Sequence, residues 1–160
     1  MKNIFIILLF VCSKNTQAQI NKTTVLLCNK QWQMVAYTVQ TAMDYRNENN
    51  LINDLFKDEK PCKKDDYYVF KFNNTYTQYN AAEVCTHGET DIISKGTWVF
   101  SKTDAAILNT KKNGTGAYLQ KRIIALTEKT FSFTTTIIKN KITYTFTETF
   151  EAIKTEKITL

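Results

Sequence analysis

Apolar and polar residues alternate along much of the chain from residue 31 onward. In "QWQMVAY" (31–37), Trp32, Met34 and Ala36 fall on one side of an extended chain. The same alternation recurs in "YYVFKF" (67–72), "KGTWVF" (95–100) and "ITYTFTETF" (142–150). In the last run a face that is apolar except for Glu148 is opposed by a row of threonines. This period of two predicts half-buried β-strands.

Short polar segments such as "KKNGTG" (111–116) and "KNK" (139–141) separate the strand-like runs, as in antiparallel meanders. The predicted strands lie near 31–39, 66–73, 75–80, 92–101, 105–111, 117–127, 130–138 and 141–152. Such strands, each with one apolar face, close most economically into a barrel, because closure removes exposed edges. The predicted fold class is all-β, an eight-stranded antiparallel up-and-down barrel.

One segment between the first two strands departs from the period of two. In "MDYRNENNLINDLFKDEK" (43–60), Leu51, Ile52, Leu55 and Phe56 stand at helical spacing among polar residues. This spacing predicts a short helix between the first two strands.

The predicted inner faces are rich in aromatic residues. They are Trp32, Tyr68, Phe70, Phe72, Trp98, Phe100, Phe131, Phe133, Tyr144, Phe146 and Phe150. In a barrel of eight strands, side chains either fill the interior or leave room for one small ligand. The pattern alone is compatible with both arrangements.

The first residues resemble an export signal. Lys2 precedes the apolar run "IFIILLFV", and Ala18 supplies a small residue where signal peptidase would cut. We therefore expect a signal peptide at 1–18 and a single domain at 19–160. The run is far shorter than the roughly 20 residues that span a bilayer, so no transmembrane segment is expected. The expected location is the periplasm or the extracellular space; the alternative is an outer-membrane lipoprotein anchored through Cys12.

The charge does not favour a nucleic-acid partner. The full chain carries a formal charge of +6, and the predicted signal peptide contains Lys2, Lys14 and no acidic residue, which leaves +4. The lysines are scattered, and Arg46 and Arg122 are the only arginines. Proteins that bind nucleic acids instead carry a clustered basic stripe with prominent arginines.

Export changes the expected role of cysteine, because disulfides persist outside the cytosol. After removal of residues 1–18, Cys28, Cys62 and Cys85 remain. Cys62 precedes one predicted strand and Cys85 follows the next, so both fall at the same end of the barrel. We expect a structural disulfide between them, worth roughly 3 kcal/mol on the loop-entropy model. Cys28 is expected to be a buried small apolar residue; a reactive thiol and an intermolecular disulfide are the alternatives.

The segment "EVCTHGETD" (83–91) contains residue types that bind zinc. They are Glu83, Cys85, His87 and Glu89, with Asp65 and Asp66 near them in the predicted hairpin. His87 is the only histidine, however, and Cys85 is expected in the disulfide. No metal site and no cofactor are therefore predicted.

Catalytic motifs are scarce in this sequence. Asp65 and Asp66 are adjacent, so on a strand they point to opposite faces and are poorly placed to share one substrate. The chain has no Gly-rich phosphate loop and no Gly-x-Ser-x-Gly motif. We therefore predict a protein that is not an enzyme.

The combination of "NKQWQMVAY", "CKKDDYYVFKFNNTYTQY" with a second cysteine, and "GTWVF" resembles the lipocalin-like domains of exported Bacteroidetes proteins. The resemblance covers roughly residues 26–152. It implies an eight-stranded up-and-down barrel with a cup for small apolar molecules. Lys30 stands where that family usually has a glycine, two residues before the first-strand tryptophan.

The expected function is the non-catalytic binding of a small hydrophobic ligand inside the barrel. The expected ligand-binding residues are Trp32, Tyr68, Phe70, Trp98, Arg122, Phe133, Tyr144 and Phe146. Arg122 and Glu148 are candidate inward polar groups, and an inward carboxylate needs a partner or water. The alternative is a filled barrel that serves as a structural or protein-interaction module of the cell envelope, with an envelope protein as its partner.

Overall fold

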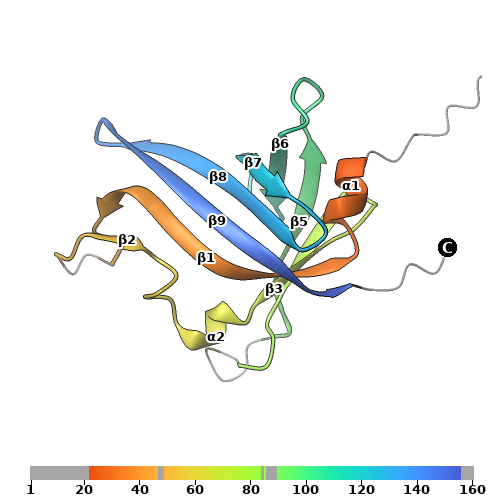
Figure 1. The fold of residues 1–160 in the computed structure, drawn as a ribbon, viewed down its shortest axis with the longest axis horizontal. Helices are drawn as coiled ribbons and strands as arrows, with labels where there is room; N and C mark the ends of the chain where they lie inside the picture. Colours follow the sequence, from red (N-terminus) through yellow and green to blue (C-terminus); the bar gives the residue numbers. More distant parts are fainter. Residues whose placement is uncertain (1–21, 47–48, 84, 86–89, 156–160) are drawn as a thin grey trace, which may run out of the picture.

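The alternating runs form strands in the computed structural model, which describes residues 22–46, 49–83, 85 and 90–155 (Figure 1). The elements are α1 (Lys22–Leu27), β1 (Lys30–Met43), β2 (Ile52–Asp54), α2 (Pro61–Lys64), β3 (Tyr67–Phe70), β4 (Thr75–Tyr79), β5 (Ile92–Phe100), β6 (Ile107–Lys112), β7 (Leu119–Leu126), β8 (Thr130–Lys139) and β9 (Ile142–Thr155). The predicted strands all have counterparts, and most bounds agree within two to three residues.

The sheet closes on itself. From β3 to β9 each strand pairs antiparallel with the next, and β1 pairs with both β3 and β9. The closing seam between β1 and β9 is long, with Lys30 opposite Thr155 at one end and Gln40 opposite Thr145 at the other. The predicted eight-stranded antiparallel barrel is thus confirmed, and β2 adds a ninth strand along β1.

A short helix does lie between β1 and β3, but not where the sequence spacing indicated. It is α2, Pro61–Lys64, whereas Ile52 begins the strand β2 and Leu55 and Phe56 lie in a turn. The backbone N–H groups of Leu55 and Phe56 both donate to the Tyr37 carbonyl oxygen. Leu55 is fully buried because this connection folds over β1, so tertiary contact and not a helix explains the apolar spacing.

The end of the barrel where β1 begins is sealed by α1 and by buried side chains. The indole Nε1 of Trp32 donates to the Leu27 carbonyl oxygen at 2.8 Å. Lys30 is 4% exposed; its ammonium lies 2.5 Å from a Glu128 carboxylate oxygen and 5.6 Å from the centroid of the Trp32 ring. The position two residues before Trp32 is therefore occupied by a lysine that is buried and paired with a carboxylate.

Two separate apolar clusters hold the fold together. The larger lies in the barrel and contains Leu27, Cys28, Trp32, Phe70, Tyr76, Trp98, Leu108, Phe131, Phe133 and Phe150. The smaller contains Val39, Leu55 and Phe146, with Tyr37, Met43, Ile52 and Tyr144 packed against it. It lies where β1, β8 and β9 extend beyond the barrel, on the left of Figure 1.

This extension leaves part of β8 with one neighbour. β7 pairs with β8 only from Arg122, opposite Thr134, to Leu126, opposite Phe131. Among the described residues, Thr135–Lys139 pair with β9 alone. The free edge ends at a tight turn in which Asn140 and Lys141 have φ values of 52° and 65°, as in the two-residue turns of β-hairpins.

Candidate functional site

The mouth of the barrel, opposite α1, is held by the disulfide that the sequence predicts. Cys62 and Cys85 are bonded, with their Cα atoms 5.2 Å apart. The bond joins the β1–β3 connection to the β4–β5 connection. Nearby, the Glu83 backbone N–H donates to Asp65 Oδ2 at 2.9 Å, which ties the same two connections together.

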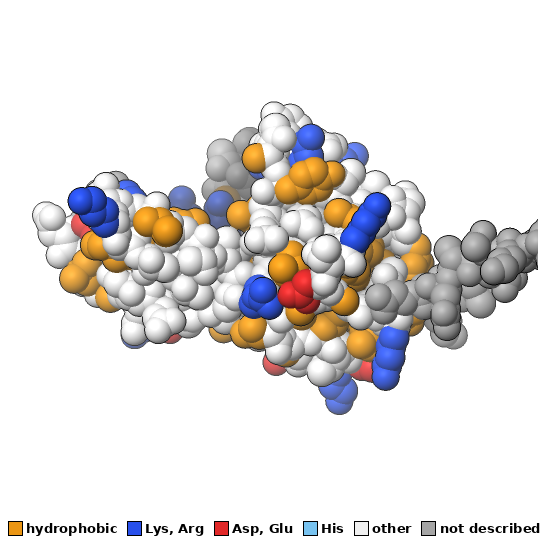
Figure 2. Space-filling model, turned by 90° about the horizontal axis from the view of Figure 1, so that it is seen from above, with side chains coloured by type: hydrophobic (Ala, Val, Ile, Leu, Met, Phe, Trp, Pro, Cys, Tyr) orange, Lys and Arg blue, Asp and Glu red, His pale blue; other side chains and the backbone are white. Residues whose placement is uncertain are grey.

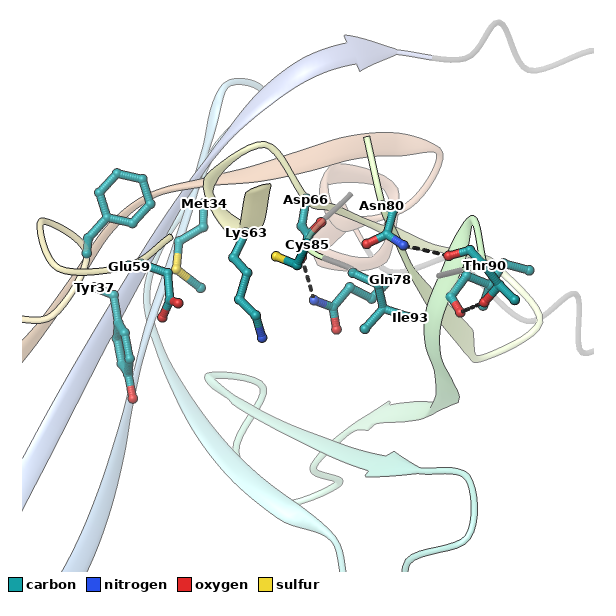
Figure 3. Close-up of a pocket in the computed structure, with 12 residues that line it drawn as sticks. Met34, Tyr37, Glu59, Lys63, Asp66, Gln78, Asn80, Cys85, Thr90 and Ile93 are labelled. Carbon is teal, nitrogen blue, oxygen red and sulfur yellow. Dashed lines mark hydrogen bonds between the residues drawn. The ribbon is translucent and has the colours of Figure 1, made fainter. Parts of the chain in front are cut away.

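A pocket of about 400 Å³ lies beside the disulfide (Figure 3). Tyr37 and Met34 of β1 form one side, and Lys63 of α2 and Gln78 of β4 point into the space. Its charged residues are of both signs, because Glu59 and Asp66 also line it. This mixed lining gives the pocket no single preferred ligand charge.

A second cavity of about 460 Å³ lies inside the barrel and opens to solvent. Its aromatic lining consists of Tyr68, Phe70, Tyr76, Phe131, Phe133 and Phe150. The remaining lining residues are Gln78, Ser94, Thr110, Lys112, Thr115, Ala117, Tyr118, Leu119 and Lys121. We call this cavity the cup. Its volume falls in the range of small-molecule sites, and its mixture of aromatic rings with a few polar groups is typical of them.

Gly96 shapes one wall of the cup. Tyr76 of β4 lies directly opposite Gly96 of β5. A Cβ atom at Gly96 would overlap both the Tyr76 ring and the Lys111 carbonyl oxygen. The glycine of the "GTW" motif thus allows the Tyr76 ring to lie against β5, where it lines the cup.

A pair of charged side chains reaches the interior from opposite sides of β8. Lys121 of β7 and Glu148 of β9 are 16% and 19% exposed, and Lys121 Nζ lies 3.8 Å from Glu148 Oε1. The same ammonium lies 3.7 Å from the centroid of the Phe133 ring. Phe133 is directly opposite Glu148 in the register of β8 and β9, so its ring packs against the ion pair and makes a cation–π contact with the ammonium.

Burial governs the titration of these interior groups. Loss of hydration lowers the pKa of Lys121 and raises the pKa of Glu148, and their mutual attraction opposes both shifts only in part. Burial, followed by the charge of Glu148, raises the pKa values of Tyr68 and Tyr37. The two hydroxyls therefore stay protonated and can donate hydrogen bonds at neutral pH.

Seven of the eight predicted ligand-binding residues divide into three groups. Tyr68, Phe70 and Phe133 line the cup. Trp32 and Trp98 are 0% and 2% exposed and belong to the packed core, not to the cup lining. Tyr144 and Phe146 lie in the smaller cluster, because β9 has left the barrel at that point.

The inward placement of Arg122 is wrong. Its side chain is 60% exposed and its guanidinium lies 3.4 Å from Asp104 on the outer surface. The neighbouring Lys121 faces inward instead. The register of β7 and β8 shifts between Ile123 and Ala125, and this bulge breaks the simple alternation of inward and outward residues along β7.

Sequence reasoning also left out several residues of the cup. They are Tyr76, Gln78, Ser94, Thr110, Lys121, Phe131 and Phe150. Phe131 and Phe150 were assigned to inner faces, and their parity alone could have added them to the site. Neither Tyr76 nor Gln78 was assigned to an inner face from the sequence, and the bulge in β7 obscures the orientation of Lys121.

The interior carboxylate was anticipated, and its partner is now defined. The sequence placed Glu148 on the apolar face and required a partner or water for it; Lys121 is that partner. Cys28 is 2% exposed and has no disulfide, and burial raises its pKa to about 12. Its predicted role as a buried small residue is confirmed.

Several expectations fall on residues outside the described ranges: the signal peptide, Cys12, His87 and Glu89. Within the described ranges, no cluster of three or more histidine, cysteine or acidic residues could hold a metal ion. The helices described there are all too short and polar to cross a bilayer. On the face shown in Figure 2, lysine and arginine side chains stand apart from one another and form no continuous stripe.

Comparison with known proteins leaves the family open. No protein-family model matches the chain, and no curated protein matches it in sequence.

Proposed function

We propose that this chain is an exported lipocalin-like barrel that binds one small hydrophobic molecule in its cup and catalyses no reaction. The observation that carries the proposal is the cup itself, about 460 Å³ of space lined by aromatic rings within a closed barrel. A filled barrel would have no such volume. The disulfide between Cys62 and Cys85 supports the export part of the proposal, because such bonds persist outside the cytosol.

The aromatic lining of the cup supports an aromatic or otherwise flat apolar ligand. Phe131, Phe133 and Phe150 pack against one another with ring centroids 5.3 to 5.8 Å apart. All three line the cup with apolar surface, and they also belong to the packed core, where they are 1 to 3% exposed. Burying a ligand against such a surface is favourable by about 25 cal/mol for each Å² of apolar area removed from water.

The proposal is tested by titration with N-phenylnaphthylamine, an uncharged dye that fluoresces in apolar sites. We expect one dye per chain. Ser94 lines the cup and is 8% exposed, so Ser94→Phe fills the space and abolishes binding. Thr110→Phe is a second filling variant, should the first fail to fold. Thr103→Phe, at an exposed position of the β5–β6 turn, is the matched control and leaves binding unchanged. Binding that survives a folded filling variant would overturn the proposal.

One observation favours the alternative function, an interaction module. The free edge of β8 exposes Ile137 and Ile138, which are 42% and 74% exposed. A strand edge of this kind adds a further strand readily. A second copy of the chain fits it, because antiparallel pairing centred on Ile137 places Thr135 opposite Lys139 and Thr136 opposite Ile138, with no like charges opposed.

A further inference from the structure

The charges that line the cup are all of one sign. Its lining contains two lysines, Lys112 and Lys121, and no aspartate or glutamate. The pocket beside the disulfide differs, since Glu59 and Asp66 line it together with Lys63. A third lysine, Lys111, is not part of the lining, but its ammonium lies 5.7 Å from the centroid of the ring of Tyr118, which lines the cup. The lining of the cup is therefore basic, although Glu148, which lies outside the lining, partly offsets the charge of Lys121.

The innermost of these cations has unused hydrogen-bonding capacity. An ammonium carries three N–H donors. Lys121 Nζ lies 3.8 Å from its ion-pair partner, Glu148 Oε1, a distance longer than a direct hydrogen bond. The Phe133 ring covers one side of the ammonium. The remaining donors are thus available to a ligand in the cup.

We propose that the cup binds an amphipathic organic anion, whose apolar body lies on Phe131, Phe133 and Phe150 and whose anionic group is held by the Lys121 ammonium. This inference rests on the proposed function, and it adds the chemical class of the ligand. Lys112 and Lys111 contribute at the rim by attracting the anion. A charge-assisted hydrogen bond in a partly dry site is strong enough to discriminate an anion from its uncharged analogue by about tenfold or more.

Glu148 sets the strength of this interaction, because its carboxylate competes with the ligand for the same ammonium. The groups that face Glu148 are Lys121 from β7, Phe133 from β8, Tyr37 from β1 and Tyr68 from β3. Lys121 is the only cation among them, whereas both tyrosines are neutral donors. An anion that enters the cup would leave one uncompensated negative charge while Glu148 stays ionised. Removing the charge of Glu148 should therefore strengthen anion binding.

The test compares two dyes with the same ring system. Anilinonaphthalene sulfonate carries an anionic group, and N-phenylnaphthylamine lacks it. Dissociation constants of both are measured for the wild type, for Glu148→Gln, and for the double variant Lys121→Met/Glu148→Gln, in which no buried charge is left alone. Lys95→Met, which removes an exposed lysine from the outer face of β5, is the matched control.

We expect Glu148→Gln to bind the sulfonate dye about tenfold more tightly than the wild type does. The double variant should lose this tighter binding, and it should also lose the preference of the wild type for the sulfonate dye over the uncharged dye. Binding of the uncharged dye should change by less than about twofold throughout, and Lys95→Met should match the wild type. If both dyes bind in the cup but the double variant still prefers the sulfonate, the role of Lys121 is overturned while the cup stands. If neither dye binds with defined stoichiometry, the proposed function fails with it.

Discussion

At the scale of single residues, the buried pair of Lys121 and Glu148 is the feature that the barrel does not need for its fold. The pKa of each group moves in the direction that disfavours its charge, which means that their attraction at 3.8 Å does not fully offset the loss of hydration. Paired buried charges with shifted pKa values are often found at functional sites. Two apolar side chains at these positions would be buried without the free-energy cost of removing two charges from water.

We predict that Lys121→Met destabilises the protein in a pH-dependent way. Without the ammonium, the pKa of Glu148 rises further above its ordinary value of 4.5. A carboxyl group whose pKa is raised by folding contributes stability below its unfolded pKa and loses it as pH rises through the folded pKa. The variant should therefore lose roughly 2–3 kcal/mol near neutral pH and much less near pH 4.

Urea denaturation of the wild type and the variant across this pH range measures the effect. The double variant Lys121→Met/Glu148→Met is the control, because it buries no charge and should recover most of the loss at neutral pH. A Lys121→Met penalty that is independent of pH would show that Glu148 is not the group left unpaired.

The same pair shows how far sequence reasoning reaches at this scale. Glu148 lies in a long, regular alternation, so its inward orientation could be predicted. Lys121 lies in "QKRIIAL", where consecutive apolar residues and a bulge obscure the period. The choice between Lys121 and Arg122 then depends on register with β8, which only the folded sheet supplies.

At the scale of elements, the disulfide joins the two connections that border the mouth of the barrel. The sequence separation of 23 residues between Cys62 and Cys85 corresponds to a stabilisation of about 3 kcal/mol on the loop-entropy model. The predicted pairing could be reached from the sequence because strand order alone places both cysteines at one end. The segment 51–56 shows the opposite case, since burial of Leu55 by β1 is a long-range contact with no local signal.

Reduction of the disulfide should lower the free energy of unfolding by about 2–4 kcal/mol. Denaturation with and without dithiothreitol measures this change. The variant Cys62→Ser/Cys85→Ser should show the same loss and no further response to the reductant, because Cys28 is buried and unbonded. A response in that variant would mean that the reductant acts elsewhere.

The free edge of β8 leads to a prediction on self-association. Ile138→Lys should lower the tendency of the chain to dimerise, because an edge lysine opposes the addition of another strand. Light scattering over a concentration series measures the mass. Ile124→Lys on β7, a strand with a neighbour on each side, is the control, because Ile124 is also exposed. A wild type that stays monomeric at all concentrations would contradict the second-copy pairing.

At the scale of the whole molecule, the closure of the sheet into a barrel and the packing of the barrel interior are separate properties. Closure of the barrel could be predicted because eight amphipathic strands, most of them joined by short turns, leave few alternatives. How far side chains fill the interior could not be predicted, because this depends on where each aromatic ring lies along the barrel. Trp32 and Trp98 pack at the closed end and Phe146 leaves the barrel, which together leave the cup open.

The measurement that tests the central claim most directly is a set of nuclear Overhauser effects between N-phenylnaphthylamine and the protein labelled at phenylalanine and isoleucine. A ligand in the cup should show contacts to the rings of Phe70, Phe133 and Phe150. Contacts confined to the methyl groups of Ile137 and Ile138 would place the dye on the exposed edge and contradict the account of a binding cup.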